Sequence, residues 1–322
     1  SLRRLNINHC ELSHITLAII IQQIIATCYN LAVLQISNNN SKHNHANSIT
    51  SNNNAATSDI NLTNELGNLL KCAKLTRLNI KSLQELDLEK FTTDLKYAAK
   101  LQVLNISYVR GFKCYLQQLE TAIMATPIKE LYATAIANNL LDKNDTSIIC
   151  NIMHKNSLKV LNIEKVNLDI TFPASLAYNT NLRKLVVSTE SITFANNLLQ
   201  TLETNSTLLD LSLYTSSHEA LDNNVAKYFH TNSTLRHLRL ITRSSTVGQS
   251  ILNTILSGNN KTLQTLTFPS STSIYCDPQS LLHALEHHKV ALYYAVPFPL
   301  ACSQSRKLLE ENKKRASMIL IM

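Results

Sequence analysis

The stretch Leu158-Lys-Val-Leu161-Asn-Ile163 belongs to a pattern that occurs ten times, with small changes, along the 322-residue chain. Successive copies start 24 to 30 residues apart, except for one spacing of 44. A fixed-period apolar signature predicts a repeat architecture, in which each unit packs only on its neighbours and one core runs along the array. The other nine copies begin at Leu2, Leu31, Leu75, Leu101, Ile128, Leu182, Leu208, Leu235 and Leu263.

Inside each repeat the apolar period changes. Strict alternation in the quoted stretch predicts a short strand with its leucines turned inward. Ten to fifteen residues later, segments such as 195–202, 247–256 and 281–285 place apolar residues at i, i+3 and i+4, which predicts a helix with one buried stripe. A strand and a helix in each repeat predict an α/β solenoid shaped like a horseshoe, with parallel strands on the concave face and helices on the convex face.

The first repeat, Leu2-Arg-Arg-Leu5-Asn-Ile7-Asn-His-Cys10-Glu-Leu12, fits the frame L-x-x-L-x-L-x-x-N/C-x-L at every position. The chain resembles the ribonuclease-inhibitor-like class of leucine-rich repeats, which also occurs at the ends of NOD-like receptors. This resemblance covers about residues 1–296 and implies that a protein partner binds the concave face. The second repeat keeps Asn39 at the Asn/Cys position, but others carry Leu83, Val109 or Val166, which implies differently bonded turns.

Asparagine and small hydroxyl residues mark the turns that enter the strands. Since asparagine tolerates the left-handed conformation, we expect these residues to end helices. Repeats of this style also resemble leucine-rich-repeat effectors of intracellular bacteria, which would place the chain in a host cytosol. The turns in question begin at Asn156, Asn179, Asn205, Asn232 and Asn260.

The spacing of 44 residues contains a polar stretch at about 37–61. After an ordinary repeat is subtracted, an insertion of about 17 residues remains, and its low apolar content predicts a flexible loop. An eleventh strand is expected near Val290 to Val296, and residues 297–322 are expected to form a capping helix and tail. The chain opens at Ser1 inside a repeat, which predicts further sequence upstream.

The net charge of the chain is +8, from 30 Lys and Arg against 22 Asp and Glu. Five positions per repeat are expected to face the concave side, and over ten repeats these hold eleven basic residues against Glu130, Glu164 and Asp210. The difference equals the entire net charge, so we predict an acidic protein partner on this face. The expected partner-binding residues are the eleven cations with two tyrosines and one histidine: Arg3, Arg4, Arg77, Lys81, Lys129, Tyr132, Lys159, Lys165, Arg183, Lys184, Tyr214, Arg236, His237 and Arg239.

Other interpretations of the basic face remain open. It could be an ordinary solvated surface, or Tyr108, Tyr132 and Tyr214 could stack nucleic-acid bases, although no nucleic-acid motif accompanies them. The repeats could also belong to a GTPase-activating protein or to a substrate receptor of a ubiquitin ligase whose other domain lies upstream. The acidic C-terminal tail of such GTPase-activating proteins is missing here, and the residues after 296 are too few for a ligase domain.

Catalytic and cofactor chemistry is not indicated. Seven scattered cysteines form no C-x-x-C pair, favour a reducing compartment and are expected to pack mostly as small hydrophobes. Four glycines are too few for a phosphate-binding loop. His43 and His45, in the polar stretch, could form at most a weak adventitious metal site, whereas His287 and His288 are adjacent on an expected helix and point different ways. The apolar run 15–25 is half a membrane span and predicts a buried helix. We expect a cytoplasmic, non-enzymatic binding protein with no cofactor, no metal and no membrane association.

Overall fold

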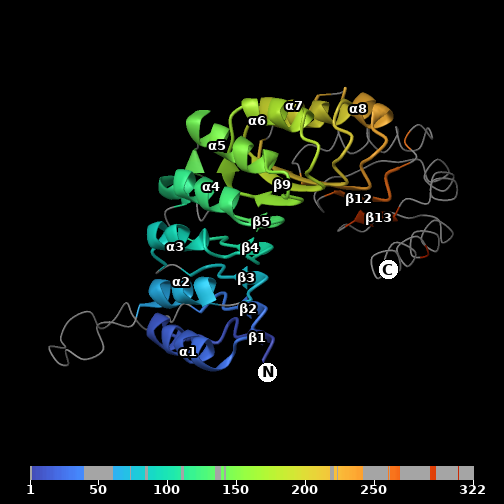
Figure 1. The fold of residues 1–322 in the computed structure, drawn as a ribbon. Helices are drawn as coiled ribbons and strands as arrows, with labels where there is room; N and C mark the ends of the chain where they lie inside the picture. The colour runs from blue at the N-terminus through green and yellow to red at the C-terminus, as the bar shows by residue number, and fades with distance from the viewer. Residues whose placement is uncertain are drawn as a thin grey trace, which may run out of the picture. The chain divides into compact units, whose positions relative to one another are not determined.

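The structure is a computed structural model that describes residues 2–39, 61–72, 74–83, 86–109, 112–134, 139–140, 143–217, 221–222, 224–241, 260, 262–268, 291–294 and 311. The chain forms two compact units. Unit 1 contains Ser1–Asn139 and Lys155–Lys165, and unit 2 contains Leu140–His154 and Val166–Met322. In both units each repeat contributes a strand, and a helix follows most of the strands (Figure 1).

Unit 1 holds a parallel sheet whose strands pair in sequence order. Its helices all lie on one side of the strands (Figure 1). The strands are β1 (Arg4–Asn6), β2 (Val33–Gln35), β3 (Arg77–Asn79), β4 (Val103–Asn105), β5 (Glu130–Tyr132) and β7 (Val160–Ile163). The helices are α1 (His14–Thr27), α2 (Leu62–Cys72), α3 (Leu88–Leu95), the 3-10 turn η2 (Phe112–Tyr115) and α4 (Leu116–Ala125).

Unit 2 repeats the arrangement with longer strands, and its strands also pair in parallel and in sequence order. The sheet strands are β9 (Lys184–Thr189), β10 (Asp210–Thr215), β11 (His237–Ile241), β12 (Thr265–Phe268) and β13 (Ala291–Tyr294). The remaining elements are α5 (Lys143–His154), α6 (Thr171–Ala177), α7 (Ile192–Gln200), η3 (Thr201–Glu203), α8 (Val225–Thr231) and the two-residue strand β8 (Val166–Asn167). The two-residue strand β6 (Asn139–Leu140) has one residue in each unit.

The repeated leucines form the core of each unit. In unit 1 the middle leucines Leu34, Leu78 and Leu104 have no exposed surface, and in unit 2 the same holds for Leu185 and Leu211. Burial of one such side chain stabilises the fold by about 2 kcal/mol. Since the registers place these leucines opposite one another on neighbouring strands, the prediction of inward leucines and of an α/β leucine-rich-repeat solenoid is confirmed.

Several helices begin at side-chain caps that the sequence supplies. Ser13 precedes α1 and accepts a hydrogen bond from the backbone N–H of Thr16, and Ser191 does the same for Phe194 in α7. Such caps satisfy amide groups that the first helical turn leaves without partners. The apolar run 15–25 lies in α1 and buries Leu17, Ala18, Ile21 and Ile24, as predicted.

The strands of unit 1 end in tight turns that use left-handed backbone. In five repeats, the residue four positions after the central leucine of the strand has a φ between 57° and 63°. This conformation is uncommon for residues other than glycine and ends each strand after three or four residues. The residues concerned are His9, Asn38, Ser82, Tyr108 and Lys165.

The strand-entering asparagines of unit 2 are buried and have an ordinary backbone. Asn179, Asn205, Asn232 and Asn260 are at most 5% exposed, and none has a positive φ, so the prediction of left-handed turns was wrong. Each side-chain oxygen accepts from its own turn, and each Nδ2 donates to carbonyl groups of the preceding repeat. These four residues, which we call the asparagine ladder, therefore join consecutive repeats, because each side-chain amide satisfies backbone groups on both sides.

Lys155, rather than Asn156, occupies the equivalent position in unit 1. Its side chain is buried, and Nζ donates to the carbonyl groups of Ile123 and Thr126 at the end of α4. A cation at a helix C-terminus interacts favourably with the helix dipole. Burial lowers the pKa of the Lys155 ammonium group.

The remaining expectations about organisation have mixed outcomes. The eleventh strand is confirmed as β13, within the expected range of 290–296. Residues 37–39 of the insertion form the turn after β2, with Ser37 and Asn39 buried, and residues 40–60 lie outside the described residues. The tail 297–322 also lies outside them, apart from Glu311, as do the helical segments 247–256 and 281–285.

The cysteine expectation needs a correction. Cys150 is buried, but Cys10 and Cys114 are exposed and Cys28 is partly exposed, so most of these four are not packed as core residues. The four form no disulfide. Cys10 lies in a polar turn, where its backbone N–H donates to Oδ1 of Asn39.

Candidate functional site

The candidate site is the helix-free side of the sheet, which we call the strand face of each unit. In unit 1 the side chains that alternate with the core leucines form two rows across the strands. The charged row contains Arg4, Val33, Arg77, Val103, Glu130 and Val160. The amide row contains Asn6, Gln35, Asn79, Asn105, Tyr132 and Asn162.

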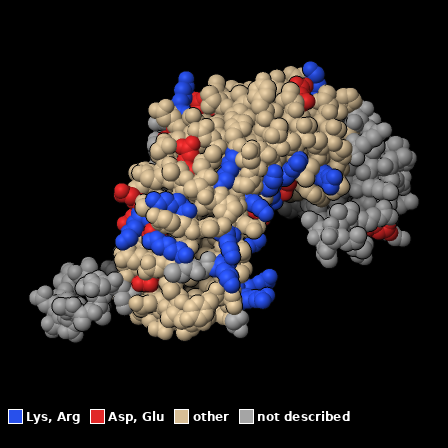
Figure 2. All heavy atoms as spheres, in the orientation of Figure 1, with Lys and Arg blue, Asp and Glu red and all other residues tan. Residues whose placement is uncertain are grey.

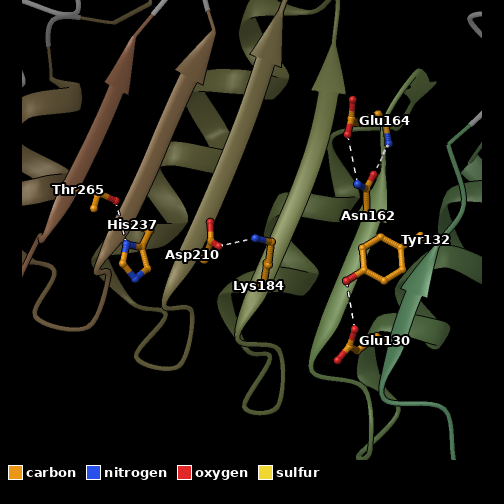
Figure 3. A network of polar contacts seen from close by, with 8 residues as sticks. All are labelled: Glu130, Tyr132, Asn162, Glu164, Lys184, Asp210, His237 and Thr265. Carbon is orange, nitrogen blue, oxygen red and sulfur yellow. Dashed lines mark hydrogen bonds and ion pairs between the residues drawn. The ribbon is translucent and has the colours of Figure 1, made fainter. Parts of the chain in front are cut away.

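Unit 2 has the corresponding rows on its own strand face. Registers place Lys184, Asp210, His237 and Thr265 opposite one another, and Val186, Ser212, Arg239 and Thr267 form the next row. Val186 and Ser212 are only 6% and 8% exposed, so this face is more closed than that of unit 1. Polar contacts cross between strands within the first row, as Figure 3 shows for Lys184 with Asp210 and for His237 with Thr265.

The fourteen sequence-predicted residues all lie on or beside these strands, and none of them is buried. Those that lie within strands are Arg4, Arg77, Tyr132, Lys184, Tyr214, His237 and Arg239. Those in the residues immediately before a strand are Arg3, Lys129, Lys159, Arg183 and Arg236, and those in the turns after a strand are Lys81 and Lys165. Figure 2 shows Lys and Arg side chains along the strand side of β1 to β4, and others on the helix side.

The acidic residues of the strand faces are engaged by neighbours. Glu130 accepts a hydrogen bond of 3.1 Å from the hydroxyl of Tyr132, and Glu164 accepts one of 3.2 Å from Nδ2 of Asn162 (Figure 3). In unit 2, Asp210 forms an ion pair of 2.6 Å with Lys184. Each carboxylate thus has a local partner, and the predicted cations outnumber the carboxylates on both faces.

The three tyrosines of the strand faces each have a contact within their own unit. Lys81 and Lys165 place their ammonium groups 5.1 and 5.4 Å from the ring centre of Tyr108. Arg239 lies 5.5 Å from the ring centre of Tyr214. Cations at these distances are attracted to the aromatic ring. The rings therefore help to position cations, which gives them a role other than the base stacking considered from the sequence.

His237 and Tyr132 have perturbed ionisation. Burial is the main reason that the pKa of His237 is lowered, and its Nδ1 lies 2.8 Å from the hydroxyl oxygen of Thr265. Burial, followed by the charge of Glu130 and its hydrogen bond, raises the pKa of Tyr132 to about 12. Neither group is therefore charged near neutral pH, and the charge of the faces comes from Lys, Arg and carboxylate groups.

The ionisation of Tyr132 provides a test of this contact. In a titration followed by phenolate absorbance, the component that Tyr132→Phe removes is expected to have a pKa of about 12, against the usual 10.0. Glu130→Gln is expected to lower it, because the carboxylate charge that opposes phenolate formation is gone. A component that titrates near the usual value in the otherwise unchanged protein would contradict the Tyr132–Glu130 contact, and circular dichroism would show that the fold persists over the range.

The amide row was missed by the sequence reasoning. Side-chain oxygens of Asn6, Asn79 and Asn105 accept from backbone N–H groups two residues later, at 3.1, 3.2 and 3.0 Å. Their Nδ2 groups donate to no other described residue. The repeated Leu-Asn-Ile triplet in the sequence was the available signal, but the amide groups are brought into one row only by the parallel register.

The described part of the chain offers neither a metal-ligand group nor a membrane-spanning helix. No group of three or more His, Cys, Asp and Glu side chains comes together there as metal ligands. Among the same residues, no helix is both long enough and apolar enough to cross a membrane.

Comparisons with known proteins give limited information. No protein-family model matches the chain, and no curated protein matches it. Among solved structures it is similar to leiomodin-1 actin-binding site 2, at 15% identity over 46% of this chain and 89% of that chain, with a TM-score of 0.35. It is also similar to human 5T4 (Wnt-activated inhibitory factor 1, trophoblast glycoprotein), at 16% identity over 69% and 73% of the two chains, with a TM-score of 0.34.

The class of protein follows from the molecule itself. Its regularly spaced strands, parallel registers and buried leucine positions define a leucine-rich-repeat fold.

Proposed function

We propose that the chain is a non-enzymatic protein-interaction module that binds an acidic partner protein through its basic strand faces. The proposal includes the ribonuclease-inhibitor-like class of repeats and a cytoplasmic location. The observation that carries it is the excess of exposed cations on the helix-free side of each unit. The strand face of unit 1 carries seven of the expected cations and two carboxylates, and that of unit 2 carries four cations and one carboxylate.

Electrostatic and geometric features of the faces support a protein ligand. A row of cations on rigid strands raises the local concentration of an acidic surface and accelerates its association. Arginine side chains such as Arg77 and Arg236 can form two parallel hydrogen bonds with one carboxylate. Extended repeat surfaces of this kind present many neighbouring side chains at once, which suits a macromolecule better than a small substrate.

Charge reversal on the faces is expected to abolish capture of the partner. The variant carries glutamate at two exposed positions of each unit, Arg3, Arg77, Arg183 and Arg236. We expect binding of partners from a cytosolic lysate to fall by at least about tenfold, because each new carboxylate repels an acidic surface. Capture by the unmodified chain should also weaken as salt is raised, since exposed charges are screened.

A matched variant controls for the change in net charge. It carries glutamate at four exposed lysines of the helix side, Lys90, Lys96, Lys143 and Lys227, and thus has the same net charge. We expect it to capture the same proteins as the unmodified chain. If both variants lose capture equally, or if neither does, the basic strand faces are an ordinary solvated surface and the proposed function is wrong.

A further inference from the structure

We infer that the acidic partner docks on the strand face of unit 1, as a helix whose acidic and aliphatic side chains alternate along the charged row from β1 to β5. This inference rests on the proposed function and assigns it a location and a ligand chemistry. The order of side chains in that row is cation, valine, cation, valine, carboxylate. A complementary helix therefore carries acid, aliphatic, acid, aliphatic and base in the same direction.

Three of the four cations on the strand face of unit 2 already have a side-chain contact within the unit. Lys184 is paired with Asp210 at 2.6 Å, and Arg239 lies over the ring of Tyr214. Nη1 of Arg183 donates to the carbonyl oxygen of Thr207 at 3.0 Å. A partner carboxylate that approached these groups would compete with contacts that already exist, which reduces the gain on binding.

The cations of the charged row in unit 1 are not compensated in this way. Arg4 and Arg77 are exposed and form no ion pair with another described residue. The carboxylate of the same row, Glu130, accepts a hydrogen bond from the hydroxyl of Tyr132 and forms no ion pair with Arg77. Charged groups held on strands without partners are the ones from which an incoming carboxylate gains most.

Spacing across the sheet matches the repeat of a helix. Neighbouring strands are about 4.8 Å apart, so Arg4 and Arg77, two strands apart, are separated by about 10 Å, with Val33 midway. Residues i and i+7 of an α-helix are separated by about 10.5 Å along the axis and lie on one face, with i+3 and i+4 between them. A helix that lies across the strands can thus place acidic side chains on the arginines and aliphatic ones on Val33 and Val103.

The match continues to the carboxylate end of the row. Arg4 and Glu130 are four strands apart, about 19 Å, whereas residues i and i+14 of a helix are about 21 Å apart. A basic residue at i+14 would therefore reach Glu130. Because this end attracts the opposite charge, the row also specifies the direction in which the helix lies.

One further feature of the same face favours a ligand with anionic oxygens. The Nδ2 groups of Asn6, Asn79 and Asn105 in the amide row, which donate to no other described residue, lie beside the charged row and can donate to carboxylates. Lys81 and Lys165 already contact the ring of Tyr108, so they gain less from a partner carboxylate than Arg4 and Arg77 do.

The test uses the full chain and a synthetic helical peptide of about 20 residues, labelled for fluorescence anisotropy. The peptide carries Glu at i and i+7, Leu at i+3 and i+11, Lys at i+14 and helix-forming residues elsewhere. A second peptide has the same composition with these positions permuted. Two chain variants each remove two cations: Arg4→Gln with Arg77→Gln in unit 1, and Arg183→Gln with Arg236→Gln in unit 2.

We expect the unit 1 variant to bind the designed peptide at least about tenfold more weakly than the unmodified chain, and the unit 2 variant to stay within about twofold. The permuted peptide is expected to bind at least tenfold more weakly to the unmodified chain. A chain with Arg77→Glu should regain affinity for a peptide with Lys at i+7, which shows that lost binding reflects charge and not misfolding.

The inference is overturned if the designed peptide does not bind, if both double variants lose affinity equally, or if the permuted peptide binds as well. If only the unit 2 variant loses affinity for the designed peptide, the assignment of binding to unit 1 is wrong, but the proposed function of the basic strand faces stands. The proposed function is tested separately, by the capture of proteins from a lysate with the four-site charge-reversal variant, and that test does not depend on the result with the peptide.

Discussion

Asn205→Ala is expected to lower the free energy of unfolding by about 3 kcal/mol, because four hydrogen bonds to the backbone are lost and the N–H groups of Thr207 and Leu208 lose their acceptor among the described residues. Nδ2 of Asn205 donates to the carbonyl oxygens of Leu176 and Asn179 at 2.8 and 3.1 Å. Its Oδ1 accepts from the N–H groups of Thr207 and Leu208 at 3.0 and 2.9 Å. The residue is 3% exposed, so water cannot easily replace these bonds.

Denaturant unfolding followed by circular dichroism would measure the loss. The control is Asn144→Ala, at an exposed position in the first turn of α5 in the same unit, which is expected to change stability by less than about 0.5 kcal/mol. If Asn205→Ala also stayed below about 1 kcal/mol, the asparagine ladder would not be a major link between repeats of unit 2.

Gly67→Ala is expected to destabilise unit 1 by about 2 to 4 kcal/mol, although alanine favours helices over glycine. A Cβ at position 67 of α2 would lie 2.1 Å from Oδ2 of Asp94 and 2.8 Å from its Cγ. Asp94 belongs to α3, is 8% exposed and forms an ion pair of 2.7 Å with Lys71. To relieve the clash, either the two helices separate, which costs packing, or the buried carboxylate of Asp94 turns away and leaves Lys71.

A second background separates the clash from other effects of the substitution. The three atoms nearest to the new Cβ all belong to Asp94, so in an Asp94→Ala background the further cost of Gly67→Ala is expected to fall below about 1 kcal/mol. An equal cost in both backgrounds, measured by the same unfolding experiment, would contradict the close approach of α2 and α3 at this glycine.

The placement of charge was predictable from local pattern. Because side chains alternate along a strand, the x positions of each repeat had to face away from the core once the leucines faced inward. All fourteen residues chosen on that basis are partly or fully exposed, and the expected carboxylates Glu130, Glu164 and Asp210 lie on the same faces. Their state of pairing was not predictable, since Lys184 and Asp210 come together only through the register of β9 and β10.

The errors of the sequence reasoning concern contacts between repeats. Asn156 was expected to belong to the series of strand-entering asparagines, but Lys155 occupies the equivalent position in the structure. Its ammonium group donates to carbonyl groups at the end of α4. The strand-entering asparagines were assigned a backbone role, whereas their side chains link neighbouring repeats. Such contacts join residues about 27 positions apart, and a local pattern does not show which of two adjacent polar residues turns inward.

By itself, the sequence determined the repeat architecture, the inward leucines, the strand positions through β13 and the basic character of the strand faces. These properties follow from periodicity, because alternation and helical spacing fix which side of each element is buried. Only the tertiary structure decided which cations are paired, which asparagines join the repeats, and where Gly67 must leave room for Asp94. These depend on the distances between side chains of neighbouring repeats, which arise when the strands take their register and the helices pack.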